Sequence, residues 1–272
     1  MPTLTAAACA DLEEALTALA VSASLAILKI ARTGTVRSKA DGSPVTPADE
    51  AAEAVIRDGL ARLAPALPVI SEEAAAREKP HAIAGGSYFL VDPLDGTRDF
   101  IAGRDEYTVN IAVVTDGMPL LGVIAAPALG LIWRGIAGRG AARLTFAAGG
   151  ATSLPQAIHA REPAPGALRV MVSRSHLEAR TKAYVDSLPV AALVPCGSSI
   201  KFCRLAEGAA DLYARLAPTH DWDIAAGHAI LAAAGGTMMA PNGAPIVYGS
   251  EDLLIPAFLA WGDPARAAPI KD

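Results

Sequence analysis

The sequence predicts an α/β protein in which mixed sheets and helices lie in layers. Apolar, strand-like runs alternate with helical stretches along most of the chain, which is typical of layered α/β folds. The turn signal Gly117-Met118-Pro119 separates two neighbouring strand candidates and indicates a hairpin, hence mixed rather than purely parallel sheets. With 272 residues, 52% of them hydrophobic, the chain can bury a sizeable core as one large domain or two small ones.

The amino-terminal half is predicted to contain two helices followed by a run of strands. A helix over about residues 8–32 accounts for six apolar residues at helical spacing, namely Leu12, Leu16, Leu19, Ala23, Ile27 and Ile30. A second helix over 47–64 is indicated by Thr46-Pro47-Ala48-Asp49, which offers an N-cap threonine, a proline at the first helical position and an acid at the third. Strands are predicted over residues 68–71, 87–92, 107–115, 120–125 and about 130–136.

The stretch from Ala147 to Ala167 is rich in Gly, Ala and Pro and only weakly periodic. It predicts a boundary between an amino-terminal subdomain, residues 1–148, and a carboxy-terminal subdomain, residues 149–272. Beyond it, Arg169-Val170-Met171-Val172 opens a second α/β unit. Helices are predicted there over about residues 176–187, from about residue 199, and over 223–234.

Composition narrows the class of protein. A net charge of -5 and a pI near 5.6 argue against a non-specific nucleic-acid binder or a basic membrane-surface protein. The three cysteines contain no Cys-x-x-Cys pair, so we expect reduced thiols rather than disulfides or a zinc site. Leu16–Leu28 is short for a membrane span, and the amino terminus lacks the basic region of a signal peptide. We expect a cytoplasmic protein, with peripheral association at the inner membrane left open.

The most informative segment is Asp92-Pro93-Leu94-Asp95-Gly96-Thr97. It follows the apolar run Tyr88-Phe89-Leu90-Val91, which predicts a buried strand that stops at Asp92. Two carboxylates and a hydroxyl therefore leave the carboxyl end of a strand, the edge of an open α/β sheet where ligands bind. Carboxylates this close repel one another unless a cation lies between them. An isolated Asp-Gly is more often a plain polar turn, and the distant acidic segments decide between the two interpretations.

Three further acidic segments accompany this one: Lys39 with Asp41 to Asp49, Val69 to Glu73, and Asp221 to Gly227. Each has an ordinary structural interpretation. Asp49 fits the capping box of the helix that follows it, and Asp223 can be the N-cap of another helix. Glu72 and Glu73 can form a solvated strand end.

Together the four segments, in this order, resemble the inositol monophosphatase superfamily of Mg-dependent phosphatases, most closely its CysQ branch of 3′(2′),5′-bisphosphate nucleotidases. The resemblance spans about residues 36–240. Glu106 to Ile111, Ser173 to His176 and Gly197 to Cys203 also look like that branch. It implies an αβαβα sandwich of two subdomains, with the active site between them.

The resemblance also implies how the acidic residues act. Two or three Mg²⁺ ions would be held by Glu72, Asp92, the carbonyl of Leu94, Asp95 and Asp223. An all-oxygen set suits Mg²⁺, whereas zinc would favour Cys or His. Asp49 and Thr97 would together polarise the attacking water, so no covalent phosphoenzyme is needed. Inhibition by Li⁺ is implied as well.

Substrate contacts are implied for Gly96, Thr97, Ser173, His176, Gly197 and Lys201. Gly96 permits close approach to a phosphate, and Lys201 near a helix start can hold a second phosphate with amides of Gly197 to Ser199. Lys201 can also be a solvated helix residue and His176 a helix-start hydrogen-bonding group. The predicted reaction removes the 3′-phosphate of adenosine 3′,5′-bisphosphate. An inositol or sugar phosphatase is the alternative, and a catalytically silent relative a third. We expect a small phosphorylated substrate, no nucleic-acid partner, no stable membrane insertion, and a monomer or homodimer.

Overall fold

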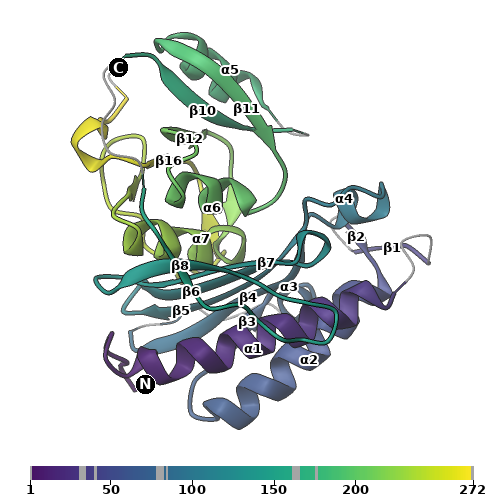
Figure 1. Ribbon diagram of the computed structural model, residues 1–272. Helices are drawn as coiled ribbons and strands as arrows, with labels where there is room; N and C mark the ends of the chain where they lie inside the picture. Colours follow the sequence, from purple (N-terminus) through teal and green to yellow (C-terminus); the bar gives the residue numbers. More distant parts are fainter. Residues whose placement is uncertain are drawn as a thin grey trace.

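The computed structural model describes residues 2–30, 35–39, 42–77, 83, 85–160, 166–174 and 177–270. Five layers alternate between helices and sheets (Figure 1). Helices α1 (Cys9–Leu28) and α2 (Pro47–Leu63) cover one face of a seven-stranded sheet, and α6 (Ile200–Ala206) and α7 (Asp221–Ala233) lie on its other face. A five-stranded sheet follows, and α5 (Ala179–Asp186) covers the outer side of that sheet. The predicted layered α/β fold is confirmed.

The seven-stranded sheet has the order β3-β4-β5-β6-β7-β8-β9. Only β3 and β4 pair in parallel, and the other neighbours are antiparallel. The strands are β3 (Val69–Ser71), β4 (Ser87–Asp95), β5 (Thr108–Thr115), β6 (Met118–Ala126), β7 (Leu131–Ile136), β8 (Gly140–Thr145) and β9 (Gln156–Ile158). The predicted hairpin joins β5 to β6, and its turn is Asp116-Gly117, one residue earlier than expected, with both residues at positive φ.

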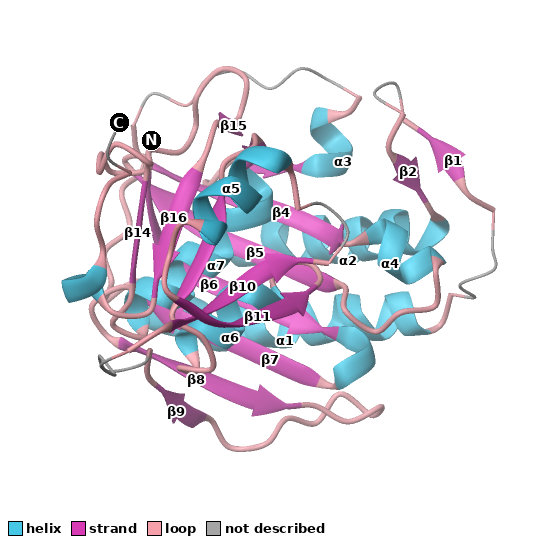
Figure 2. Ribbon diagram, turned by 90° about the horizontal axis from the view of Figure 1, so that it is seen from above, coloured by secondary structure: helices cyan, strands magenta, loops and turns pink. Residues whose placement is uncertain are grey.

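The five-stranded sheet has the order β11-β10-β12-β16-β14 and is also mixed. Its strands are β10 (Leu168–Ser173), β11 (Val190–Cys196), β12 (Leu212–Arg215), β14 (Thr237–Met239) and β16 (Phe258–Trp261). Two short pairs complete the described chain: β1 (Arg37–Ser38) with β2 (Pro44–Val45), and β13 (Thr219–His220) with β15 (Leu254–Ile255). Figure 2 places β1, β2 and the short helix α4 (Thr97–Ile101) at the same end of the molecule.

Several element boundaries differ from the prediction. The first helix ends at Leu28, and α5 begins only at Ala179. Strand β8 and its partner β9 were not predicted, because β9 has only three residues and the chain around both strands is rich in small residues. Strand β9 extends the first sheet beyond residue 148, while the second sheet begins at Leu168. The division at 148/149 stays a prediction.

The central layer packs tightly on the first sheet. Strand β5 is buried along almost its whole length, since helices cover both faces, and this explains its nearly continuous apolar run. Helix α7 crosses close to β6, where a Cβ at Gly122 would lie only 2.2 Å from the carbonyl oxygen of Ala226. This close contact leaves no room for a side chain at Gly122 and sets how closely α7 lies on β6. No described helix is both long and apolar enough to span a membrane.

A buried histidine on α7 predicts a pH effect on stability. His228 donates or accepts one hydrogen bond, 3.0 Å from its Nδ1 to the Tyr248 hydroxyl, and burial lowers its pKa from the usual 6.5 to about 4. Between these two values the unfolded chain binds more protons at this residue than the folded chain, so its contribution to stability is lost as pH falls. We expect His228→Gln, which cannot titrate, to gain on the order of 2–3 kcal/mol relative to the parent protein across this window.

The measurement is urea unfolding of both proteins between about pH 4 and about pH 7. Because the comparison is a difference, titration of other groups cancels. A constant difference in unfolding free energy across the window would contradict a depressed pKa at His228.

Candidate active site

Strand ends and helix starts meet around a pocket of about 670 Å³. The end of β4 and the starts of α3 (Glu72–Ala75), α4, α6 and α7 all contribute to its lining. Among the predicted site residues, those lining it are Glu72, Asp92, Leu94, Asp95, Gly96, Thr97, Ser173, Gly197, Lys201 and Asp223. Asp49 lies behind Thr97 and contacts it, whereas His176 falls outside the described residues. Segments far apart in sequence therefore form one site.

The end of β4 carries the two central carboxylates on an irregular stretch of strand. Asp92 pairs with Asn110, the register then shifts, and pairing resumes between Asp95 and Thr108. The prediction that the strand stops at Asp92 is therefore wrong, because β4 continues to Asp95 beyond one irregularity in its pairing. That irregularity accommodates Pro93, which has no amide hydrogen to donate. Gly96 follows at φ 92°, a conformation that favours glycine, and starts α4.

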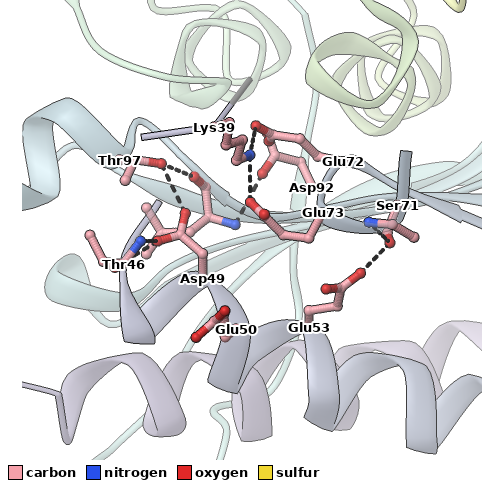
Figure 3. A network of polar contacts seen from close by, with 12 residues as sticks. Lys39, Thr46, Asp49, Glu50, Glu53, Ser71, Glu72, Glu73, Asp92 and Thr97 are labelled. Atoms are coloured by element: carbon pink, nitrogen blue, oxygen red, sulfur yellow. Dashed lines mark hydrogen bonds and ion pairs between the residues drawn. The ribbon is translucent and has the colours of Figure 1, made fainter. Parts of the chain in front are cut away.

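Asp49 caps a helix with one carboxylate oxygen and contacts Thr97 with the other. Its Oδ2 accepts the Thr46 amide at 2.8 Å and the Thr46 hydroxyl at 2.6 Å, which completes the capping box of α2. Its Oδ1 accepts the Thr97 hydroxyl at 3.0 Å. The cap therefore holds the carboxylate so that the second oxygen faces Thr97 (Figure 3). Burial raises the pKa of Asp49, although these hydrogen bonds oppose the shift.

Glu72 and Glu73 share one cation. The Lys39 ammonium lies 2.6 Å from an oxygen of each, and Figure 3 shows it beside Asp92. Burial alone would lower the pKa of Lys39, but the two glutamates outweigh burial and raise it. The predicted solvated strand end is wrong for Glu73, which is buried. The ammonium occupies a place among the carboxylates that a metal ion could compete for.

The carboxylates of the pocket are electrostatically costly without a cation. Burial raises the pKa of Asp92 well above the usual range, and the charges of Glu72, Asp95 and Asp223 raise it further. Burial likewise raises the pKa of Glu72 to about 7. Asp92 is 1% exposed, and its Oδ2 has no hydrogen-bond partner among the described residues. An oxygen-only set with an orphaned buried oxygen fits a hard divalent cation.

The described residues do not form a complete set of metal ligands around one position. Within them, no three His, Cys, Asp or Glu side chains are arranged as a ready ligand set. Instead each carboxylate is held by protein donors. Asp223 accepts the Thr219 hydroxyl at 2.5 Å and the His220 amide at 3.2 Å, and it sits at the third position of α7 rather than at its N-cap. The predicted N-cap role is therefore corrected to a capping-box role, the same as that of Asp49.

The part of the pocket that the carboxy-terminal half of the chain forms differs from expectation in which groups are free to bind a phosphate. Lys201 is 5% exposed, and its ammonium donates to the Ser198 carbonyl at 2.6 Å and lies 5.2 Å from the centre of the Tyr213 ring. It is not a solvated helix residue. The amide of Gly197 is already bonded to Glu106 Oε2 at 2.5 Å, and the amide of Ser199 to Asp95 at 2.7 Å. These two amides are not free to hold a phosphate in this arrangement.

Sequence reasoning assigned no role to Arg215, which also lines the pocket. It lies two residues after Tyr213 on β12, and the two-residue period of a strand places both on one face. That spacing was a usable signal. Lys39 was noticed in the sequence, but its pairing with Glu72 could not be read from a separation of 33 residues.

Comparison with known proteins identifies the family. The model of the inositol monophosphatase family matches residues 3–268. Proteins named 3′(2′),5′-bisphosphate nucleotidase CysQ are similar over 226 residues, at 44% identity in Shigella flexneri and 43% in Escherichia coli K12. Each match covers 82% of this chain and 87% of the relative.

Solved structures show the same architecture. The crystal structure of CysQ from Bacteroides thetaiotaomicron, a bacterial member of the family, has a TM-score of 0.75 at 35% identity, covering 91% of this chain and 96% of that one. An inositol monophosphatase from Anabaena gives a TM-score of 0.73 at 22% identity, covering 93% and 91% of the two chains, and this supports the fold alone. The chain belongs to the inositol monophosphatase family.

Proposed function

We propose that this protein is a 3′(2′),5′-bisphosphate nucleotidase that removes the 3′-phosphate of adenosine 3′,5′-bisphosphate, giving AMP and phosphate. The observation that carries the proposal is the 43–44% identity, over most of the chain, to proteins named for this activity. The geometry supports it, because the acidic residues and Lys201 line one pocket. Such a pocket suits a small substrate with two phosphates.

The residues fit the metal on which the family depends in general, Mg²⁺. Two or three ions would be held by Glu72, Asp92, the Leu94 carbonyl, Asp95 and Asp223. Bound Mg²⁺ supplies charge neutralisation and a more acidic water. A bound cation would offset the mutual repulsion of the carboxylates, which Lys39 offsets for Glu72 and Glu73 in this structure.

Thr97 and Asp49 orient the water. The Thr97 hydroxyl lies 3.0 Å from Asp49 Oδ1 and 3.1 Å from the Leu94 carbonyl. Its single proton is donated to one of these, so its oxygen lone pairs are available to accept a hydrogen bond from a water molecule. Asp49 thereby sets the direction of the hydrogen bond, and the water oxygen is turned towards the phosphorus.

The test is a phosphate-release screen over adenosine 3′,5′-bisphosphate, its 3′-monophosphate analogue, inositol 1-phosphate and fructose 1,6-bisphosphate, with Mg²⁺ and with added Li⁺. We expect the bisphosphate nucleotide to give the highest kcat/KM and Li⁺ to inhibit. Preference for inositol phosphate would instead make the protein an inositol monophosphatase. We place the activity in the cytoplasm, on free nucleotide.

Lys201→Met should discriminate between substrates. Methionine keeps the packing on Tyr213 but removes the charge that would hold the 5′-phosphate, and Ser173, which lines the same pocket, would complete that contact. Loss of a charge-assisted bond should lower kcat/KM for adenosine 3′,5′-bisphosphate by about 10–100-fold. Adenosine 3′-monophosphate, which has nothing to reach Lys201, should be hydrolysed nearly as before. Equal losses on both substrates would show that Lys201 acts through the loop that it supports and not through the phosphate.

A further inference from the structure

Two donors from the carboxy-terminal half of the chain, Ser198 and Ser199, hold one oxygen of Asp95, and the Thr108 hydroxyl lies near the same oxygen. The Ser198 hydroxyl lies 2.6 Å from Asp95 Oδ2, the Ser199 amide 2.7 Å from it, and the Thr108 hydroxyl 3.5 Å. Ser198 and Ser199 join β11 to α6, whereas Asp95 ends β4 in the other sheet. The carboxylate is therefore fixed by a turn that is 103 residues away in sequence.

The hydroxyl protons around this carboxylate form a consistent network. Ser199 Oγ donates to Asn110 Oδ1 at 2.7 Å, so its lone pairs can accept the single proton of Thr108, 2.7 Å away. The Ser198 hydroxyl contacts both Thr108 Oγ1 and Asp95 Oδ2, and the charged carboxylate is the stronger acceptor for its proton. In the described part of the chain all the hydrogen bonds to the Asp95 carboxylate end on Oδ2. This leaves Oδ1 as the oxygen able to take a cation.

The backbone at Ser198 indicates that its side chain is needed. Ser198 has a φ of 52°, in the left-handed region where glycine is the ordinary choice. Glycine would relieve the backbone but offers no hydroxyl for Asp95. The Ser198 carbonyl in turn accepts the Lys201 ammonium at 2.6 Å, so one residue touches both the acidic side and the basic side of the pocket.

We infer that the Ser198–Ser199 turn is a positioning element for Asp95: it occupies Oδ2 and so presents Oδ1 to Mg²⁺. The inference rests on the proposed function only in taking Asp95 as a metal ligand. Groups that orient a ligand in this way commonly contribute about 10–100-fold to metal affinity. The same size of effect is expected here, without any contact between the serines and the metal.

The experiment measures the melting temperature of the substrate-free protein over a series of MgCl₂ concentrations, because a ligand that binds the folded state stabilises it increasingly as its concentration rises above Kd. Ser198→Gly and Ser198→Ala should each need about 10–100-fold more Mg²⁺ for the same rise. Ser22→Ala is the matched control, since Ser22 is exposed on α1 and its hydroxyl bonds only the Ala18 carbonyl, 2.9 Å away, among the described residues. Activity that Ser198→Gly loses at low Mg²⁺ should return as Mg²⁺ is raised.

Asp95→Asn tests the assignment of Asp95 as a metal ligand separately from the positioning role of the Ser198–Ser199 turn. If Asp95→Asn loses the Mg²⁺-dependent rise and both Ser198 variants titrate like the parent protein, the positioning role is overturned while Asp95 remains a ligand. If Asp95→Asn itself titrates like the parent protein, Asp95 is not a ligand and the inference is overturned with it. Loss of activity that extra Mg²⁺ cannot restore would mark the turn as merely structural.

Discussion

Asp92→Asn is expected to remove most turnover and, at the same time, to stabilise the Mg²⁺-free protein. Asparagine keeps the shape but removes one charge from the proposed metal site. Because loss of a group that only orients a ligand costs about 10–100-fold, loss of a ligand charge should lower kcat by on the order of 100-fold or more.

The gain in stability follows from the environment of the carboxyl. Asp92 is buried beside three other carboxylates, and burial followed by their charges raises its pKa. An acid whose pKa is higher when folded destabilises the folded state at any pH above its usual value of 3.8. The neutral amide removes this penalty, so in EDTA the variant should melt at a higher temperature, by roughly 2–4 °C for each kcal/mol gained.

Asp186→Asn is the control for this substitution, since Asp186 is exposed on α5 and pairs only with Lys182 among the described residues. It should change neither kcat nor the melting temperature in EDTA by much. Near-normal turnover of Asp92→Asn would rule out its role as a ligand. A lower melting temperature in EDTA would show that the carboxyl is already compensated by the protein.

Local sequence patterns predicted those parts of the site that lie on a single helix or strand. The apolar strand before Asp92 and the capping pattern at Asp49 can each be read from neighbouring residues, and the structure places both as expected, although β4 continues to Asp95. Asp49 shows why two interpretations of one residue need not compete. A carboxylate has two oxygens, and here one caps the helix while the other contacts Thr97.

Contacts between distant segments could not be predicted in the same way. No local pattern reveals that Glu106 accepts a hydrogen bond from the amide of Gly197. This hydrogen bond nevertheless changes which groups are free to bind a phosphate. The Lys39–Glu72 pair and the Ser198–Asp95 bond depend likewise on how the layers stack. Strand β9 was missed because its three residues gain their structure from β8 and not from their own pattern.

Asp49→Asn and Thr97→Ala should each lower kcat by about 10²–10⁴-fold, and the double variant by little more than the worse single change. In Asp49→Asn the amide oxygen can still accept the Thr46 amide and preserve the cap. The amide nitrogen then faces Thr97, where it donates a hydrogen bond instead of accepting one. The Thr97 hydroxyl then loses the acceptor that fixed its direction. Thr97→Ala removes the hydroxyl itself, so both substitutions abolish the same oriented group.

Thr97→Ser is the matched control, because it keeps the hydroxyl and its distance to Asp49 and should retain most activity. Melting curves separate catalysis from capping: a lost cap costs about 1 kcal/mol, whereas Thr97→Ala leaves the cap of α2 intact. If the losses in the double variant multiply, Asp49 and Thr97 do not act on one water. Asp49 would then contribute through the start of α2 alone, and the hydroxyl of Thr97 would have to be oriented by the Leu94 carbonyl, its other acceptor at 3.1 Å.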